Sequence, residues 1–457
     1  MGKHNPSGRA LGSPSARWAE GKALRKEVPR RSHGVWQPPP RRQDPIALIK
    51  ASSEDRLPRL IPLRYGRMLH SPFAFFRGAA ILMAADLAAT PVTGLRVQAC
   101  GDCHLLNFGE FATPERHLTF DLNDFDETLP APWEWDVKRF AVSVAIAGRE
   151  VGLRDRKCRA LAAHAVRAYR RAMAEFGFMT ALEVWYARLD AQTLVRLARN
   201  HSAQRLFRKT AAEARAHTVA HIFPRVTEMT AGRRRVVDDA PWVFHPSRTK
   251  AFEQEIRSFL EAYRKTLPDE RRVLLDRYQF VDAARTVVGV GSVGTRCAVA
   301  VLLAADNDPL FLQIKEARPS VLEAYAGKSV YADPGQRIVC GQHLMQSASD
   351  IFLGWAHARG GRSYYLRQLR DMKAGAHLDL MSRAELAEYA GFCAWALARA
   401  HARSGDAARI SGYLGSGGSF DEAVAGFAIA YADQNEADYT AFKKAVRAGR
   451  LEASEKA

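Results

Sequence analysis

The spacing of apolar residues along the chain predicts helices toward both ends and a β-rich segment between them. Apolar residues recur at helical spacing in residues 46–90 and 132–152, and the patterns of residues 153–265 are mostly helical too. From residue 382 an amphipathic pattern runs to Gly405, a suitable helix end, and more helix is predicted after it.

Shorter segments carry the alternation and turn signals of strands. Residues 94–100 and 116–122 each have a strand pattern, with a loop and a turn between them. Residues 285–317 are rich in β-branched residues and glycine and predict three strands. Residues 350–369 predict a hairpin around two adjacent glycines.

These patterns predict an α+β fold with a mostly helical large lobe and a small antiparallel β lobe. The first residues are rich in Pro, Gly, Ser and Arg and offer too little apolar surface to drive their own ordering. We expect a basic flexible arm at 1–45, a helical large lobe at 46–280, a β-rich small lobe at 281–372, and C-terminal helices packing on the large lobe at 373–457.

Composition indicates a globular protein. The 457 residues are 47% hydrophobic without an apolar run near 18 residues, so we expect no membrane span. The first forty residues lack a secretory signal and the six cysteines are scattered, which favours a cytoplasmic protein with reduced thiols. The net charge of +18, partly gathered in residues 205–237, suits phosphate-bearing partners such as nucleotides. Nucleic acid is a possible partner that we do not favour, and a basic surface also simply keeps a protein soluble.

The segment GDCHLLNFG, residues 101–109, carries the first candidate chemistry. Asp102 precedes Asn107 by five positions, which is the spacing in the protein-kinase catalytic loop H-R-D-x-x-x-x-N. In that loop the Asp accepts or orients the acceptor hydroxyl and the Asn binds Mg²⁺ through its amide oxygen. We therefore predict Asp102 as the catalytic residue and Asn107 as a metal ligand.

A second acidic segment, FDLNDFDE, follows after a short turn. Asp124 occupies the place of the kinase D-F-G aspartate, which holds Mg²⁺ against the nucleotide phosphates, and Asp126 is a second candidate ligand. Asp121 lies on the other face from Asp124 if the strand alternates, and one of these acidic residues could instead cap a turn. Acidic residues in a loop are also commonly just solvated.

The loop resembles the G-D-x-H-x-x-N segment of the aminoglycoside phosphotransferase and choline kinase branch of the kinase-like superfamily. Trp135-Asp136-Val137 matches the apolar-D-L pair that opens a helix in those enzymes. The resemblance implies that Asp136 binds the backbone of the catalytic loop and that His104 packs the loop. Asp102-x-His104 also matches a metal-binding pair of metal-dependent phosphoesterases. The G-D-x-x-D and G-N-H motifs expected in that class are absent from the sequence.

The nucleotide lid is predicted downstream of the catalytic loop. A G-x-G-x-x-G motif stands at 289–294, and its glycine backbone could approach phosphates closely through Gly289, Gly291, Ser292 and Gly294. Lys315 ends an apolar strand pattern and would neutralise the phosphates, as the strand β3 lysine of kinases does. Glu323 is the nearest candidate ion-pair partner for this lysine. A dinucleotide-binding turn is the alternative, and it requires a helix at 295–305.

The catalytic loop thus precedes the lid, the reverse of the kinase order. We expect a circularly permuted, two-lobed, protein-kinase-like fold in which the helix ending ALARAHARSG, residues 396–405, packs beside the catalytic loop. Permutation is physically reasonable because the chain ends of a domain often lie close together.

Most of the chain, roughly residues 20–440, also resembles the bacterial DUF2252 family. The resemblance is carried by RYGRMLHSPFAFFRGAA, GDCHLLNFG and FDLNDFDETLPAPWEWDVKR, and it implies no assigned activity. Arg64 and Arg77 lie in the first of these segments and either bind phosphate or an acidic substrate or form structural ion pairs.

These observations predict a phosphotransferase that uses ATP and Mg²⁺ on a small hydroxyl- or amine-bearing acceptor. Transfer of AMP is an alternative, because the orientation of a nucleotide cannot be read from sequence. The other class is a non-catalytic nucleotide- or nucleic-acid-binding protein that uses the basic stretches.

Overall fold

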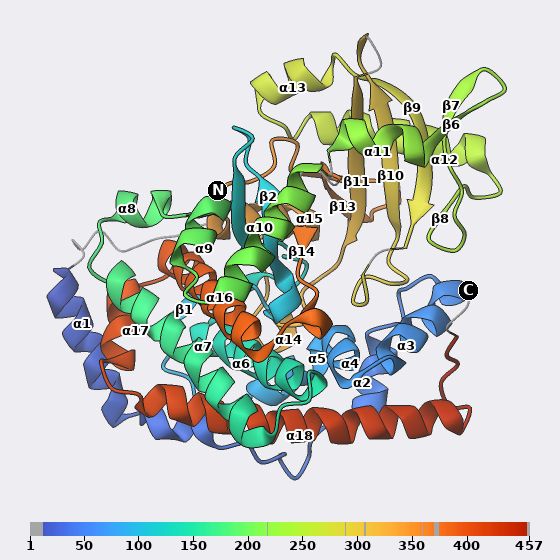
Figure 1. Ribbon diagram of the computed structural model, residues 1–457. Helices are drawn as coiled ribbons and strands as arrows, with labels where there is room; N and C mark the ends of the chain where they lie inside the picture. The colour runs from blue at the N-terminus through green and yellow to red at the C-terminus, as the bar shows by residue number, and fades with distance from the viewer. Residues whose placement is uncertain are drawn as a thin grey trace.

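The computed structural model describes residues 12–454 except 217, 288, 306–307, 359 and 370–373. Figure 1 shows a large helical body with a smaller β-rich part above it, and the long helix α18 runs along the base of the body. The mixed α+β class and the small antiparallel sheets confirm the expected fold class at this level.

The helical body forms around one apolar core. Its main helices are α6 (Trp133–Glu150), α7 (Asp155–Phe176), α16 (Arg383–Ser404), α17 (Ala407–Leu414) and α18 (Ser419–Arg447). Helix α6 is buried from Trp133 to Gly148, because α7, α16 and α18 pack around it. Its first turn carries two carboxylates, whose negative charge is stabilised by the positive end of the helix dipole.

The small lobe is a six-stranded antiparallel sheet of order β12-β13-β11-β10-β9-β8. The strands are β8 (Val243–Phe244), β9 (Gln279–Thr286), β10 (Cys297–Leu303), β11 (Pro309–Ala317), β12 (Gly354–His357) and β13 (Ser363–Gln368). The sheet is covered by α12 (Thr249–Arg264) through one apolar cluster and by α11 (Val219–Val226) through another. Helix α15 (Pro334–Met345) connects β11 to β12 and packs on the sheet beside β12 and β13.

Two smaller sheets carry the acidic segments. Strand β1 (Arg96–Ala99) pairs with β4 (Leu129–Pro132), and the second sheet has the order β14-β2-β3-β5. Its strands are β2 (Phe108–Ala112), β3 (Leu118–Leu122), β5 (Leu189–Asp190) and β14 (Ala374–Gly375). The loops that leave β1 and β3 therefore emerge near each other, with the helical body on one side and the six-stranded sheet on the other.

The remaining α-helices and β-strands lie around the helical body and the sheets described above. They are α1 (Pro14–Ala23), α2 (Pro45–Ala51), α3 (Ile61–Leu69), α4 (Pro72–Gly78), α5 (Ala80–Leu87), α8 (Ala181–Tyr186), α9 (Ala191–Leu197), α10 (His201–Ala216), α13 (Asp269–Leu275), α14 (Glu323–Ala326), β6 (Thr227–Thr230) and β7 (Arg233–Val236).

Most of the predicted elements are present. Strands β10 and β11 and the β12–β13 hairpin are confirmed, and both glycines of the hairpin turn have positive φ. The first of the three strands predicted within residues 285–317 lies earlier, as β9, and overlaps the predicted range only at Arg285 and Thr286. Because residues 297–303 form strand β10, the helix required by a dinucleotide-binding turn is absent there. The helix expected near residues 71–90 breaks at Ala79, where the backbone leaves the helical region and separates α4 from α5.

The first 45 residues differ from the expected flexible arm wherever they are described. Helix α1 packs against α17 so closely that a Cβ on Gly21 would lie 1.9 Å from the carbonyl oxygen of Arg409. Arg17 pairs with Asp406 at 3.0 Å. The composition was misleading because tertiary contacts with α17 and α18 order this segment. Residues 1–11 lie outside the described part.

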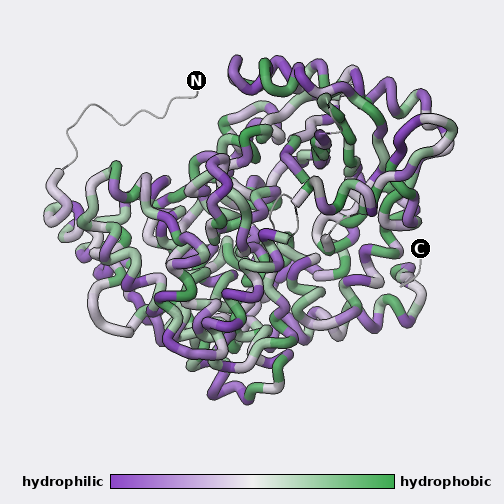
Figure 2. The backbone as a smooth tube through the Cα atoms, turned by 45° about the horizontal axis from the view of Figure 1, so that its top comes forward, coloured by the Kyte–Doolittle hydropathy of each residue, from purple (hydrophilic) through white to green (hydrophobic). Residues whose placement is uncertain are grey.

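Figure 2 shows hydrophilic and hydrophobic residues alternating within the helices. Within the described residues, none of the helices combines the length and the apolar character needed to cross a membrane.

Candidate functional site

The loop after β1 is held in place by the first turn of α6. Asp136 accepts hydrogen bonds from the backbone N–H groups of Cys100 at 2.6 Å and Gly101 at 2.9 Å. Gly101 has φ +83°, and a Cβ there would lie 2.4 Å from the carbonyl oxygen of Glu127. The turn therefore requires glycine. This backbone contact is the role that the phosphotransferase resemblance implies for Asp136.

Helix α16 holds the same loop from the C-terminal end of the chain. The hydroxyl of Tyr389 donates to the carbonyl oxygens of Leu105 at 3.1 Å and Phe108 at 3.0 Å. The ring of His401 lies 3.2 Å from Asp136. A helix almost 300 residues away in sequence thus lies beside the loop, as we expected of residues 396–405.

Asp102 is ion-paired within this loop. Its carboxylate accepts from Arg139 of α6, with Nε at 2.7 Å. Burial raises the pKa of Asp102, and the charge of Arg139 opposes that shift. Asn107 donates its amide N–H to the backbone carbonyl of Asp102, which leaves its amide oxygen free to accept. His104 is buried at 3% exposure, and burial lowers its pKa well below the ordinary value, so the ring is neutral and packs the loop.

Lys315 meets the second acidic segment. Its ammonium lies 2.9 Å from Asp126 and 3.7 Å from Asp124, although 189 residues separate it from Asp126. The hydroxyl of Tyr365 donates to the other oxygen of Asp126 at 2.6 Å. Burial alone would lower the pKa of Lys315, but the two carboxylates outweigh it and raise that pKa well above the ordinary value. Lysine 315 is therefore a charged group at this site.

The glycine motif lies directly over these carboxylates. Ser292 is 3.4 Å from Asp126, and Gly289 and Gly294 have φ of 65° and 88°, which glycine adopts readily. The loop is also tied to the N-terminal helices, because the N–H of Leu57 donates to the carbonyl of Gly294 at 2.7 Å. The predicted catalytic loop, acidic segment and lid thus meet in one place.

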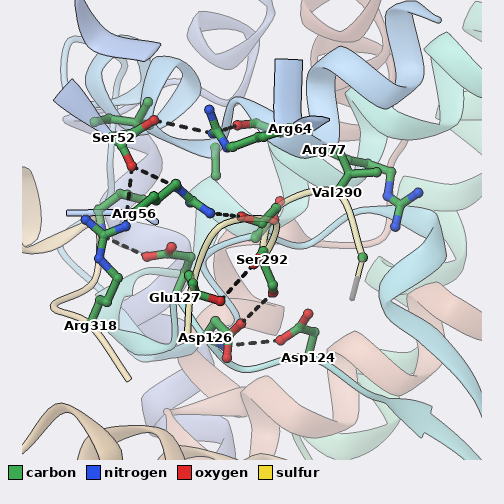
Figure 3. A pocket seen from close by; sticks show the side chains of 18 of the residues that line it. Ser52, Arg56, Arg64, Arg77, Asp124, Asp126, Glu127, Val290, Ser292 and Arg318 are labelled. Atoms are coloured by element: carbon green, nitrogen blue, oxygen red, sulfur yellow. Dashed lines mark hydrogen bonds between the residues drawn. The ribbon is translucent and has the colours of Figure 1, made fainter. Parts of the chain in front are cut away.

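A cavity of about 300 Å³ lies where these segments meet. Figure 3 shows Asp124 and Asp126 on one side of it, arginines of the N-terminal helices on the other, and Ser292 of the glycine loop between them. Its polar lining comprises Ser52, Arg56, Arg64, Arg77, Asp102, His104, Asn107, Asp124, Asp126, Glu127, Ser292, Thr295, Glu316 and Arg318.

The oxygen atoms of this cavity fit a magnesium ion only in partnership with a phosphate. The described residues contain no group of three or more His, Cys, Asp or Glu side chains that could hold a metal by themselves. Mg²⁺ in nucleotide sites commonly uses one or two carboxylates together with substrate phosphates. Asp124, with a side chain 40% exposed, and the amide oxygen of Asn107 suit that arrangement. Asp126 accepts one hydrogen bond on each oxygen, from Lys315 and Tyr365, so fewer of its lone pairs are available to a metal.

Two other acidic residues lie apart from the proposed chemistry. Glu323 lies 3.8 Å from Lys328, and the contacts of Lys315 are instead with Asp124 and Asp126. Asp121 is fully buried and pairs with Arg399 at 2.7 Å, so it joins β3 to α16.

Several residues of the site carried no signal in the sequence. Arg139 and Tyr365 contact the predicted carboxylates, and Arg56 and Arg318 line the cavity. Arg139 lies one helical turn after Asp136, and that spacing could have suggested that it faces the loop. The other three come from segments far away in sequence without a local motif.

The fold and the site define a mixed α+β protein with an acidic and arginine-lined cavity between its helical body and its six-stranded sheet. The chain belongs to the DUF2252 family, because a family model described as "Uncharacterized protein conserved in bacteria (DUF2252)" matches residues 56–445. Neither a curated protein nor a solved structure matches the chain.

Proposed function

We propose that this protein is a phosphotransferase that uses ATP and Mg²⁺, built on a circularly permuted kinase-like fold. The observation that carries the proposal is the contact of Lys315 with Asp124 and Asp126 beneath the glycine loop. A strand lysine, a glycine loop and a metal-binding aspartate are the three parts that kinases use to hold nucleotide phosphates.

The order of the strands supports this proposal. Counted from the strand that precedes the glycine loop, Lys315 lies on the third strand, β11, as the kinase lysine lies on β3. Helix α15 follows in the place of the kinase helix that supplies a glutamate. It has no acidic residue, and Asp126 and Asp124 are the carboxylates that pair with the lysine instead. The packing of α16 against the catalytic loop supports the permuted chain order.

Each residue then has a defined role. Bound Mg²⁺ would neutralise charge on the nucleotide phosphates, with Asn107 and Asp124 as its protein ligands. Asp102, oriented by Arg139, would hold the acceptor hydroxyl and take its proton. The acceptor oxygen forms a bond to the γ-phosphorus while the bond from that phosphorus to the β-phosphate oxygen breaks, and ADP leaves with the electron pair.

Calorimetry of ATP binding, with and without Mg²⁺, tests the nucleotide site. We expect the wild type to bind ATP only with Mg²⁺, and Asp124→Ala and Lys315→Ala each to weaken binding at least tenfold, about 1.4 kcal/mol. Asp433→Ala and Lys328→Ala are matched controls, because both side chains are exposed and lie outside the cavity lining.

Absence of ATP binding, or equal binding by all variants, would disprove the proposal. Product analysis separates the two transfer reactions in an enzyme that turns over. ADP indicates phosphoryl transfer, whereas pyrophosphate indicates transfer of AMP.

A further inference from the structure

Four arginines contribute to the lining of the cavity. They are Arg56, Arg64, Arg77 and Arg318, and Figure 3 shows them spread around the glycine loop, with Arg318 on one side of it and Arg77 on the other. Throughout the described part of the chain, no carboxylate forms an ion pair with any of them. Their hydrogen bonds go to neutral groups.

This arrangement differs from that of other shielded arginines in the same protein. Arg42, Arg170 and Arg399 are each paired with a carboxylate at 2.9 Å or less. A shielded charge without a partner is costly, so proteins normally pair it. Burial lowers the pKa of Arg64 well below its ordinary value, and the nearby charge of Arg56 lowers it further. The lining contains carboxylates as well, but these four guanidinium groups have no ion-pair partner among the described residues, and an anion could supply one.

Two of the four arginines are committed to the protein itself. Arg56 donates to the carbonyl oxygens of Gly291 at 2.7 Å and Val293 at 2.6 Å, so it fixes the glycine loop. Arg64 is 1% exposed and donates to the carbonyl of Gly78 at 2.6 Å. These two supply positive potential and position their neighbours.

Arg77 is free to bind a ligand. Its guanidinium makes no hydrogen bond to any described residue, and its Nε is buried without a partner. Burial lowers the pKa of Arg77, and the carboxylate that opposes this shift most strongly is Asp102, followed by Asp124. Arg77 and Asp102 both line the cavity, and the proposed function places the acceptor beside Asp102. Arg318 has a single 3.3 Å bond to the carbonyl of Ser52, but Figure 3 shows it on the other side of the glycine loop from Arg77.

We propose that the second substrate is a small anionic molecule whose carboxylate or phosphate group is bound by Arg77. A planar guanidinium can grip either group with two parallel hydrogen bonds. The reacting hydroxyl of that molecule then lies beside Asp102. This inference rests on the proposed function, since it assigns the acceptor class of the same site.

Calorimetry with three matched probes tests the inference on protein loaded with Mg²⁺ and a non-hydrolysable ATP analogue. The probes are glycerol, D-glycerate and glycerol 3-phosphate, which share hydroxyl groups and differ in their anionic group. We expect one or both anions to bind and glycerol not to bind. Arg77→Gln should weaken anion binding at least about tenfold, the effect of losing a charge-assisted hydrogen bond, whereas Arg318→Gln should change it by less than about threefold. Arg159→Gln, on the exposed face of α7, is the control.

The outcomes separate this inference from the proposed function. If Arg77→Gln keeps nucleotide binding within a factor of about two and loses the anion, Arg77 binds the acceptor. If this variant loses the nucleotide instead, Arg77 binds the nucleotide phosphates and the inference is wrong, although the phosphotransferase proposal stands. Equal binding of all three probes by a wild type that binds nucleotide also overturns it. If the wild type does not bind nucleotide, the proposed function fails and this acceptor assignment fails with it. Thermal melting of each variant verifies that it is folded.

Discussion

Asp136 connects three distant parts of the chain through one carboxylate. It receives two N–H groups from residues 100–101 and lies 3.2 Å from His401, and it is 1% exposed. Buried N–H groups need an acceptor, because water cannot reach them. At the scale of single residues, the geometry of the loop at residues 101–109 thus depends on a side chain that lies outside the cavity lining.

Asp136→Ala should therefore lower stability strongly. One buried and one partly buried N–H group lose their acceptor, and each loss costs about 1–3 kcal/mol, so we expect the free energy of unfolding to fall by roughly 2–6 kcal/mol. Urea unfolding measures the change, with the exposed Asp276→Ala as a control expected to change stability by less than about 1 kcal/mol. An unchanged stability would contradict the anchoring role of Asp136.

At the scale of elements, β2 connects the catalytic loop to a second cavity. Glu110 on this strand is 2% exposed and lines a space of about 220 Å³ together with Phe207 and Met381. Its Oε2 has no hydrogen-bond partner among the described residues. Burial raises the pKa of Glu110 to about 8, against the weaker attraction of Arg215. The folded protein therefore keeps a proton there that the unfolded chain releases above its ordinary value of 4.5.

Glu110 should make the protein lose stability as the pH rises from about 4.5 to about 8. In this window the folded state binds more protons than the unfolded state, so raising the pH favours unfolding by up to about 1.4 kcal/mol per pH unit. Glu110→Gln removes this term, and the variant should gain stability relative to the wild type across the window. Denaturant unfolding at pH 5, 6, 7 and 8 measures the difference. A difference independent of pH would show that Glu110 is ionised in the folded protein.

At the scale of the whole molecule, segments from the two ends of the chain close around the centre. Helix α1 packs on α17, and α16 reaches the catalytic loop, so N-terminal and C-terminal residues complete a body whose site lies in between. The approach of α1 to α17 depends on small residues, because a Cβ on Gly412 would lie 2.0 Å from the carbonyl oxygen of Trp18.

Gly21→Ala should separate α1 from α17 and lower the melting temperature. Its Cβ would overlap backbone atoms of Arg409, which cannot move aside as a flexible side chain can. A loss of about 2 kcal/mol or more corresponds to roughly 2 °C or more in a protein of 457 residues, because the entropy of unfolding grows with chain length. Gly12→Ala is the matched control, since its Cβ would meet only Ala16 at 3.7 Å. Equal melting of the two variants would show that the α1–α17 contact contributes little to stability.

The sequence alone was sufficient for much of the candidate site because its parts are local motifs. Asp102, Asn107 and Asp124 follow a fixed spacing within one loop–strand–loop unit, and the glycine motif is contiguous. The predicted strands were found for the same reason, since alternation and turn residues act over a few positions. The pairing of Glu323 with Lys315 was inferred from proximity in sequence, and the contacts of Lys315 are with other residues.

Local pattern by itself determined the α+β class, the β-rich segment and the acidic and glycine motifs of the candidate site. Only the tertiary structure decided which of these residues meet. Lys315 lies beside Asp126 across 189 positions, and Arg56 ties the glycine loop to the N-terminal helices across 235. The ordered structure of residues 12–45 likewise depends on tertiary contacts, because this segment packs against α17 and α18. The physical reason is that backbone propensity and side-chain periodicity act over a few residues, whereas burial and charge pairing act between any surfaces that the folded chain brings together.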